Sequence, residues 1–321
     1  MRTASELHVV ACKSNLLRWE TGDRHPRRFI EHMLDSGVSL TFVETQFGDR
    51  PFAFADFSKH IRYIGTRANT PAWSKESAIN VGIKALPDDA KYVAWIDTDI
   101  EFRRKDWAIE TVEQLQIMPV VQPWSEALDL GPKGEVMSVN RRYVQTSFGW
   151  VWVERGDVLN WRGKQPTGEN YPFPHPGYAW AARMDFLNDV GLLLDFSVLG
   201  SADHQMAFGM LGHADHVIRG LSTPRYQLHV KAWCDRAYRA CQGHVGYVAG
   251  RIEHQFHGEK SKRKYIERQE ILRRHGFDPL TDLHRNRYGI VELSDNGKPQ
   301  FYRDCWAYMS QRDEDANCRQ E

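Results

Sequence analysis

Residues 92–99 read YVAWIDTD, an apolar run that leads directly into two aspartates separated by one residue. The run from Tyr92 to Ile96 has the length and the β-branched and aromatic content of a buried strand in a parallel sheet. In open α/β sheets, ligands bind at the carboxyl ends of the strands, where Asp97 and Asp99 stand. Paired carboxylates are hard oxygen ligands for Mg²⁺ or Mn²⁺, and such a cation bridges the oxygens of a diphosphate. The stretch therefore predicts a strand that ends in a metal site.

The two aspartates also have a plainer interpretation, in which they cap a turn or the following helix. A triplet of this form occurs often by chance, so the motif alone does not decide between the two. Its position after an apolar strand favours the metal, because two unpaired carboxylates at such a strand end would repel each other without a cation.

Strand-like and helix-like segments alternate around this stretch through the first 122 residues. The alternation predicts the α/β fold class, with a mostly parallel central sheet that carries helices on both faces. One helix is expected to begin at Thr70, as N-cap, and Pro71. The other expected strands cover residues 7–11, 38–43, 61–64 and 120–121, and the expected helices cover residues 28–35, 71–86 and 109–115.

The pattern changes after Pro123. Residues 146–153 alternate as an antiparallel strand would, and the prolines and glycines of residues 161–176 predict a long loop. Residues 183–212 return to helical spacing, with a further strand expected at 195–199. Beyond Gly276 the chain is polar and rich in turn residues. We therefore expect a catalytic domain over residues 1–275 and a C-terminal extension, packed on it, over residues 276–321.

The composition excludes several classes of protein. The 321 residues contain 42 Lys and Arg against 42 Asp and Glu, with 41% hydrophobic and 26% charged residues. These values are ordinary for a globular protein and exclude a disordered, collagen-like or coiled-coil chain. A formal net charge of zero argues against a protein that coats nucleic acid, although it leaves room for a local basic groove.

Targeting signals and a disulfide framework are not expected. Residues 1–10 lack the apolar core of a signal peptide, and no apolar run approaches the roughly 18 residues of a membrane span. The five cysteines are scattered and odd in number, as is typical of reduced thiols. We expect a soluble cytoplasmic protein.

Around the acidic pair, the chain resembles nucleotide-sugar-dependent glycosyltransferases of the GT-A fold, of a family-2-like, phage or bacterial type. In that family an Asp-x-Asp triplet after the fourth strand carries the metal and the donor diphosphate. The resemblance spans about residues 7–280 and implies a GT-A fold. The segments that carry it, besides the triplet, are residues 73–80 (WSKESAIN), 175–180 (HPGYAW), 200–204 (GSADH), 254–258 (HQFHG) and the run from Tyr265 through Arg268 to Pro279.

The resemblance implies a metal site made of Asp97, Asp99 and a histidine near the carboxyl end, for which we favour His257 over His254 because Gly258 allows a close backbone approach. A histidine ligand favours Mn²⁺ over Mg²⁺. A zinc site from the pairs His213/His216 and His254/His257 is the alternative, and it lacks cysteine partners at useful spacing.

Asp203 is the residue that the resemblance implies as the general base, which would remove the proton of the acceptor hydroxyl. The plainer interpretation makes Asp203 a cap of the helix that begins near Gln205. The sequence departs from the family's acidic pair, since Ala202 stands at the first acidic position and His204 follows.

A second set of residues is expected to bind the donor base, ribose, sugar or phosphates. Trp73 has a core interpretation as well, and Lys262 belongs to the basic run 260–264, most of which is otherwise a solvated loop face. The full set is Ala11, Lys13, Glu44, Arg67, Trp73, Lys75, Asn80, Asp97, Gly177 and Lys262.

These features predict a metal-dependent glycosyltransferase that uses a nucleotide-diphosphate sugar, expected to be a UDP-sugar. The acceptor stays open between a hydroxymethylated pyrimidine in phage DNA, for which residues 103–105 and 260–264 offer a basic lining, and a saccharide, a lipid-linked glycan or a protein hydroxyl. A nucleotidyltransferase is less favoured, because residues 11–15 contain no glycine for a phosphate loop. A non-catalytic sugar-nucleotide-binding protein is the remaining alternative.

Overall fold

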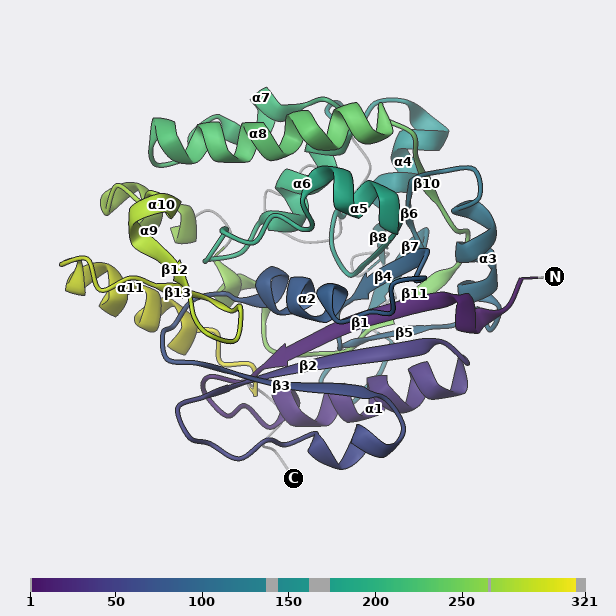
Figure 1. Cartoon of the computed structure of the whole chain (residues 1–321), viewed down its shortest axis with the longest axis horizontal. Coiled ribbons are helices and arrows are strands. Elements are labelled where there is room, and N and C mark those ends of the chain that lie inside the picture. The colour runs from purple at the N-terminus through teal and green to yellow at the C-terminus, as the bar shows by residue number, and fades with distance from the viewer. Residues whose placement is uncertain (1, 137–143, 162–173, 265–266, 316–321) are drawn as a thin grey trace.

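In the computed structural model, which describes residues 2–136, 144–161, 174–264 and 267–315, a seven-stranded sheet in the order β10-β6-β9-β4-β1-β2-β3 forms the centre of the molecule (Figure 1). Strand β9 runs antiparallel to β4 and β6, and the other neighbours are parallel. The predicted α/β class with a mostly parallel sheet is therefore confirmed. The strands are β1 Leu7–Ser14, β2 Ser39–Phe47, β3 Arg62–Ala68, β4 Tyr92–Ile96, β6 Val120–Gln122, β9 Ala179–Arg183 and β10 Val245–Tyr247.

Helices cover both faces of this sheet because its central strands are apolar on both sides. In β1 the side chains of Val9 and Ala11 enter one buried cluster and Val10 enters the opposite one. The first cluster is covered by α1 Thr21–Asp35 and α3 Trp107–Gln114. The second is covered by α2 Lys75–Lys84, α4 Phe148–Arg155, α5 Met184–Val190, α6 Ala202–Met210, α7 Ala214–Ile218 and α8 Pro224–Cys241.

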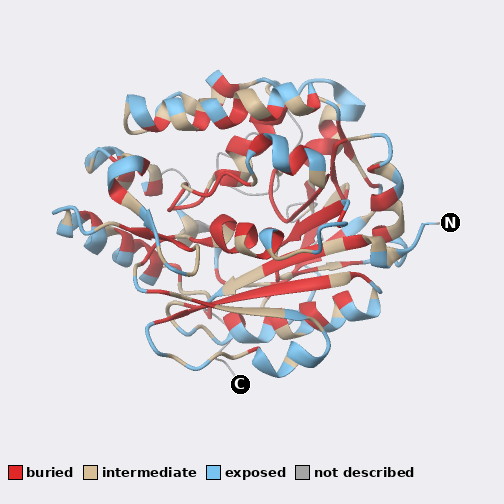
Figure 2. Ribbon diagram, viewed as in Figure 1, coloured by how far each residue is buried: buried red, intermediate tan, exposed pale blue. Residues whose placement is uncertain are grey.

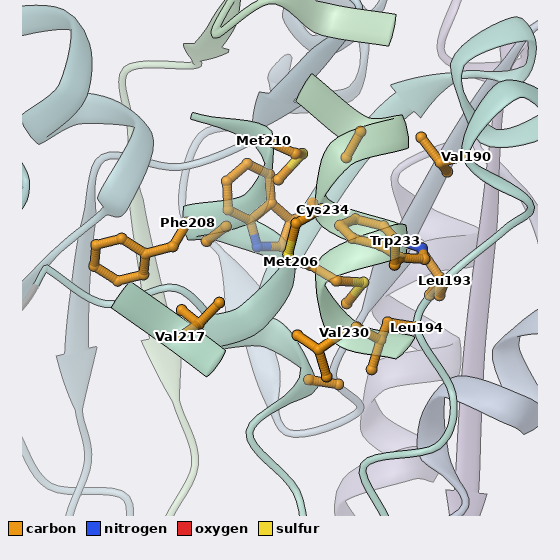
Figure 3. Packing of buried hydrophobic residues seen from close by; sticks show 14 of the residues in the cluster. Val190, Leu193, Leu194, Met206, Phe208, Met210, Val217, Val230, Trp233 and Cys234 are labelled. Carbon is orange, nitrogen blue, oxygen red and sulfur yellow. The ribbon is translucent and has the colours of Figure 1, made fainter. Parts of the chain in front are cut away.

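Helix α6 packs against α8 within the larger buried cluster (Figure 3). Met206 and Met210 of α6 belong to the same buried cluster as Val230 and Trp233 of α8. The two helices approach closely at Gly209, where a Cβ atom would lie 2.7 Å from the Sγ of Cys234. Figure 2 shows the outcome, with buried residues along the sheet and its inner helices and exposed residues on the outer side of α8.

A second sheet, in the order β5-β11-β7-β8, begins just after β4 in the sequence, because β5 starts at Ile100. It pairs β11 antiparallel with β5 and parallel with β7, so distant segments meet directly beside the acidic triplet. Its strands are β5 Ile100–Phe102, β7 Glu126–Asp129, β8 Val144–Thr146 and β11 Arg251–His254.

The C-terminal residues pack on the core. The backbone N–H of Val291 donates to Ser77 Oγ of α2 (3.2 Å), and that of Leu293 donates to Thr70 Oγ1 (3.0 Å). The boundary at residue 275 stays a prediction. The elements of this part and the segment before it are α9 Glu267–Arg274, α10 Pro279–Asp282, β12 Leu283–Arg285, β13 Val291–Leu293 and α11 Pro299–Ser310.

Residues 312–315, which we call the C-terminal segment, return to the amino-terminal half. The carboxylate of Asp315 accepts the backbone N–H groups of Glu20 (2.7 Å) and Thr21 (2.9 Å), and so caps the start of α1. The same segment lies against Gly258, whose φ is +86°. A Cβ atom there would lie 2.9 Å from the carbonyl oxygen of Asp313.

Several local predictions are wrong. Residues 148–155 form helix α4 rather than a strand, because Ser147 caps it by accepting the N–H of Trp150 (3.0 Å) and Gly156 ends it with φ +72°. Helix α2 begins at Lys75, not at Pro71, and residues 195–199 form no strand. The apparently turn-rich tail contains the 12-residue helix α11. Most of the predicted loop 161–176 lies outside the described residues.

Two further expectations concern the cysteines and membrane-spanning helices. Cys12, Cys234, Cys241 and Cys305 are free, as expected, and Cys318 lies outside the described residues. Among the parts of the chain that the structure describes, no helix is both long enough and apolar enough to pass through a bilayer.

The close contact between α2 and the sheet gives a stability prediction. A Cβ atom at Gly82 would lie 2.5 Å from Val10 Cγ1 and 3.0 Å from Val43 Cγ2, so Gly82→Ala is expected to lower the free energy of unfolding by about 1–3 kcal/mol despite alanine's better helix propensity. Urea unfolding measures this. The control Lys84→Ala, at an exposed position of the same helix, is expected to change stability by less than about 0.5 kcal/mol.

Candidate metal and donor site

Asp99, His254 and His257 converge beside the carboxyl end of β4, with one ligand atom from each lying within 4.8 Å of the others. Asp99 Oδ2 is 3.1 Å from His257 Nε2 and 3.7 Å from His254 Nε2, and the two Nε2 atoms are 3.0 Å apart. The sheet causes this meeting, because β11 pairs with β5 so that His254 lies opposite Ile100, the residue after Asp99. Both histidines between which the sequence left a choice are therefore present.

The chemistry of these three groups fits a divalent cation. His254 Nδ1 lies 2.7 Å from Asp129 Oδ1, which fixes the proton of a neutral ring on Nδ1 and leaves the Nε2 lone pair directed at the other two groups. Asp99 Oδ1 is buried and has no hydrogen-bond partner among the described residues. A buried carboxylate oxygen without a partner is costly unless a cation binds it. Two imidazole nitrogens and a carboxylate suit Mn²⁺ better than Mg²⁺.

The electrostatics favour the metal-binding forms of Asp99 and His257, whereas the raised pKa of His254 means that this ring gives up a proton when a metal binds. Burial alone would raise the pKa of Asp99, but the imidazoles of His257 and His254 hold it well below its ordinary value. Burial lowers the pKa of His257, and the guanidinium of Arg263, 2.8 Å away through Nη2, lowers it further. Burial opposes the charged form of His254, yet Asp99 and Asp129 raise its pKa. The carboxylate is thus ionised and His257 neutral, which are the forms that bind a metal.

Asp97, the other acidic residue of the triplet, faces Lys75 rather than the two histidines. The two side chains form an ion pair, and the Asp97 N–H donates to the carbonyl of Tyr178 (2.8 Å). Burial raises the pKa of Asp97 although Lys75 lowers it. Lys75 is the first residue of α2, so a cation and a helix N-terminus lie together beside the cluster. Direct metal binding by Asp97 stays a prediction.

Asp203 lies on the same side of the molecule as this ion pair. Its charge raises the pKa of Lys75 and of Asp97, which requires proximity to both. A Cβ atom at Gly177 would lie 2.8 Å from Asp203 Oδ2 and 3.0 Å from His175 Cε1. A Cβ at this position would displace the Asp203 carboxylate or the His175 ring, so the loop before β9 packs closely on the carboxylate. The predicted base and Gly177 are thus neighbours.

Several predicted donor residues have their polar atoms engaged within the protein. Glu44 accepts the backbone N–H groups of Ala53 (2.7 Å) and Phe54 (3.0 Å) as well as the hydroxyl of Tyr63 (2.6 Å). Asn80 exchanges hydrogen bonds with the backbone of Leu193 and donates to the carboxylate of Asp195. These two side chains support the loops they contact, and a donor contact by either stays a prediction.

The remaining donor candidates divide by position. Ala11 is fully buried in the core. Arg67 donates to the carbonyls of Gly48 (2.7 Å) and Arg50 (2.9 Å), away from the cluster. Lys13, near the end of β1, is half-buried. Binding of the nucleotide sugar by Lys13 or Arg67 stays a prediction.

The C-terminal segment contributes side chains that the sequence did not single out. The guanidinium of Arg312 lies 4.7 Å from the ring centroid of Trp73, and its charge lowers the pKa of His257. Asp313 binds the ammonium of Lys262 (2.7 Å). Asp129 is the other residue that was missed. The signal that finds these residues is tertiary, because each partner lies more than 50 residues away in the sequence.

The alternative zinc site does not form from both histidine pairs. His216 packs on Phe208 (ring centroids 4.7 Å apart) and near His204 (5.9 Å), within the α6–α7 region. Among the described residues, the cluster of Asp99 with His254 and His257 is the set that could hold a metal ion.

Asp129→Asn is expected to weaken Mn²⁺ binding about 10- to 100-fold, because the amide lacks the carboxylate charge that strengthens His254 as a ligand and can turn its NH2 group toward Nδ1. Titration of Mn²⁺, followed by the EPR signal of the free ion, measures the effect. Asp106→Asn, at an exposed position near the start of α3, is the control and is expected to bind Mn²⁺ as the unaltered chain does.

His204 gives a pH prediction. Burial lowers its pKa from 6.5 to about 4, while the unfolded ring takes a proton near pH 6.5. Between those values the unfolded state binds more protons, so stability falls as the pH falls from 6.5 to 4. In His204→Gln this loss is expected to be smaller by about 1–3 kcal/mol, measured by urea unfolding at pH 7 and pH 4.5. An equal loss in the variant would contradict the prediction, and His60→Gln, at an exposed position, is the control.

No protein-family model matches the chain, and no curated protein matches it in sequence. Among solved structures, the chain is similar to TarS from S. aureus, with 10% identity and a TM-score of 0.38 over 73% of this chain and 72% of that one. It is also similar to the catalytic domain of Drosophila beta1,4-galactosyltransferase 7 in complex with xylobiose, with 12% identity and a TM-score of 0.41 over 93% and 98% of the two chains. A third similar structure is 4-diphosphocytidyl-2C-methyl-D-erythritol synthase from Anaerococcus prevotii, with 11% identity and a TM-score of 0.34 over 77% and 88%. At these levels of similarity, the functional conclusion rests on the geometry of the site.

Proposed function

We propose that this protein is a metal-dependent glycosyltransferase of the GT-A type, which transfers a sugar from a nucleotide-diphosphate sugar, a UDP-sugar, to an acceptor hydroxyl. The observation that carries the proposal is the meeting of Asp99, His254 and His257 at the carboxyl end of β4, with Asp203 close to the neighbouring ion pair of Lys75 and Asp97. A metal site for a diphosphate and a separate carboxylate for the acceptor are the two parts that such a transfer needs.

On the donor side, Asp99, His254 and His257 would hold Mn²⁺, which when bound offsets the negative charge of the leaving diphosphate. Lys75 supplies a fixed positive charge from the first turn of α2. In the protein this charge is paired with Asp97. A donor phosphate that enters would bind the Lys75 ammonium, and a donor ribose would bind the Asp97 carboxylate through its hydroxyls. Gly177 keeps the loop close to the sugar side.

On the acceptor side, Asp203 takes the proton of the acceptor hydroxyl onto a carboxylate oxygen. The hydroxyl oxygen forms the new bond to the anomeric carbon as the bond from that carbon to the diphosphate oxygen breaks, and the electron pair leaves with the diphosphate. The half-buried position of Asp203 allows contact with an acceptor. Its Oδ1 accepts the backbone N–H of His204 (2.8 Å), and its Oδ2 lies on the side of Gly177.

A donor panel tests the proposal. The unaltered chain is incubated with UDP-, GDP-, CDP- and dTDP-sugars, with and without Mn²⁺, and its thermal unfolding is followed. A ligand that binds the folded state raises the melting temperature, and we expect a rise with a UDP-sugar that requires Mn²⁺. A chain that neither binds nor hydrolyses any nucleotide sugar in the presence of Mn²⁺ contradicts the proposal.

For the acceptor, we propose a hydroxymethylated pyrimidine in phage DNA as the first to test. Of the cations expected to line such an acceptor, Arg103 pairs with Glu253, Arg104 with Asp106 and Glu110, and Lys262 with Asp313. Lys105 is exposed. Transfer of labelled sugar to hydroxymethylcytosine-containing DNA, and none to unmodified DNA, supports this acceptor. Transfer to an oligosaccharide, a lipid-linked glycan or a protein instead identifies the alternative class.

A further inference from the structure

We propose that Tyr178 is a positioning residue of this site. Its backbone holds Asp97, and its hydroxyl holds His254 through Asp129, so Tyr178 fixes the donor side and the metal side relative to each other. The inference deepens the proposed function and rests on it, because it concerns the same metal and donor site. Three separate contacts of Tyr178 carry it: those of its carbonyl, its hydroxyl and its ring.

The backbone of Tyr178 has an unusual conformation that serves Asp97. Its φ is +72°, in the left-handed region that residues with a bulky side chain rarely adopt. In this conformation its carbonyl accepts the N–H of Asp97 at 2.8 Å, across the pairing of β9 with β4. Backbone strain of this kind persists where the surroundings hold it, and it is found most often at functional sites.

The hydroxyl of Tyr178 reaches the residue that orients a metal ligand. It donates to Asp129 Oδ1 (3.4 Å) and accepts from Gln145 Nε2 (3.1 Å), which also donates to Asp129 Oδ2 (2.9 Å). Asp129 in turn lies 2.7 Å from His254 Nδ1. Both carboxylate oxygens of Asp129 are thus fixed by groups other than the histidine. Tyr178 and Gln145 therefore set the direction from which Asp129 meets His254.

The ring of Tyr178 lies between the two sides of the site. It stacks on His175, with centroids 3.9 Å apart and an interplanar angle of 5°, and lies 4.7 Å from the ring of His254. His175 is the ring that Gly177 faces beside Asp203. Tyr178 itself is only 5% exposed. A purely hydrophobic core residue would need neither the strained backbone nor the hydroxyl network.

Tyr178→Phe separates these contacts, because it removes the hydroxyl and keeps the ring and the backbone. We expect the Kd for Mn²⁺ to rise about tenfold, at the lower end of the range for losing a residue that orients a metal ligand, because Tyr178 acts one step further away, through Asp129. The EPR spectrum of the bound ion is also expected to change. The matched control is Tyr92→Phe, which removes a hydroxyl bound by Gln116 Nε2 (2.7 Å) at the other end of β4. The control is expected to bind Mn²⁺ as the unaltered chain does.

A double-mutant cycle tests the route through Asp129. If Tyr178 acts through this carboxylate, adding Tyr178→Phe to Asp129→Asn weakens Mn²⁺ binding by less than twofold, although each single change weakens it clearly. Full additivity of the two effects overturns this route. Unchanged Mn²⁺ binding and an unchanged EPR spectrum in Tyr178→Phe overturn the positioning role itself.

The outcome for the unaltered chain separates this inference from the proposed function. If the unaltered chain binds Mn²⁺ and Tyr178→Phe weakens that binding, the inference stands even when no nucleotide sugar is used. If the unaltered chain transfers sugar with Mn²⁺ and Tyr178→Phe binds the ion equally well, only the inference fails. An unaltered chain that binds no Mn²⁺ overturns both.

Discussion

Asp99→Asn is expected to weaken Mn²⁺ binding by more than about 100-fold and to abolish Mn²⁺-dependent sugar transfer, since losing a direct ligand costs more than losing the partner that orients one. Among the described residues, Asp99 is the carboxylate that lies within 4 Å of both imidazoles, through its Oδ2, and its Oδ1 has no hydrogen-bond partner. The amide keeps the shape of the side chain but not its charge. Titration calorimetry with Mn²⁺ measures the binding without reference to turnover.

The matched control for this prediction is Asp88→Asn, at an exposed position before β4, which is expected to leave Mn²⁺ binding unchanged. Circular dichroism and the melting temperature establish that both variants fold. A folded Asp99→Asn protein that binds Mn²⁺ within a few-fold of the unaltered chain would show that the ion binds elsewhere. The assignment of the three ligands would then be wrong.

Asp203→Asn is expected to lower kcat for sugar transfer by about 10²- to 10⁴-fold, the range that a positioned general base contributes. Binding of Mn²⁺ and of the donor is expected to persist, because Asp203 is not among the three clustered residues proposed to bind the metal. This split between turnover and binding distinguishes a base from a residue that merely stabilises the first turn of α6. Steady-state kinetics, together with Mn²⁺ and donor titrations of the same preparation, measure both quantities.

Asp215→Asn, at an exposed position of the neighbouring helix α7, is the control for the loss of one negative charge. It is expected to keep the kcat of the unaltered chain. Transfer by Asp203→Asn at the rate of the unaltered chain would exclude this carboxylate as the base. Glu76, which is buried close enough to Asp203 and Lys75 to be influenced by both, would then be the next carboxylate to test.

The central part of the fold was predictable from the sequence because its signals are local. Strand β4 has the predicted ends, Tyr92 and Ile96, since an apolar run bounded by polar residues determines both. The parallel pairing of β1 with β2 and with β4 follows from the helices α1 and α2 that stand between these strands in the sequence. Helix α4 was misread because Trp150 and Trp152 repeat with a period of two, whereas the cap at Ser147 decides the helix.

The composition of the site was harder to predict, because its partners are brought together by strand pairing over long distances. Asp129 has no motif around it, and it meets His254 because β7 and β11 pair in parallel with these two residues in register. Glu44 and Asn80 are polar residues near the expected donor pocket. Their partners, such as Phe54 and Leu193, come from loops whose course no local pattern determines.

The C-terminal segment has a consequence for the order in which the protein matures. Asp315 caps α1 at Thr21, 294 residues earlier, and Asp313 packs on the turn at Gly258 that follows the two histidines. These contacts cannot form until residues 312–315 have left the ribosome, so the sheet and its helices are synthesised well before the histidine turn gains its last support. A nascent chain stalled before Arg312 is therefore expected to have a folded sheet but to bind Mn²⁺ more weakly than the chain that includes residues 312–315. Tight Mn²⁺ binding is thus expected late in synthesis.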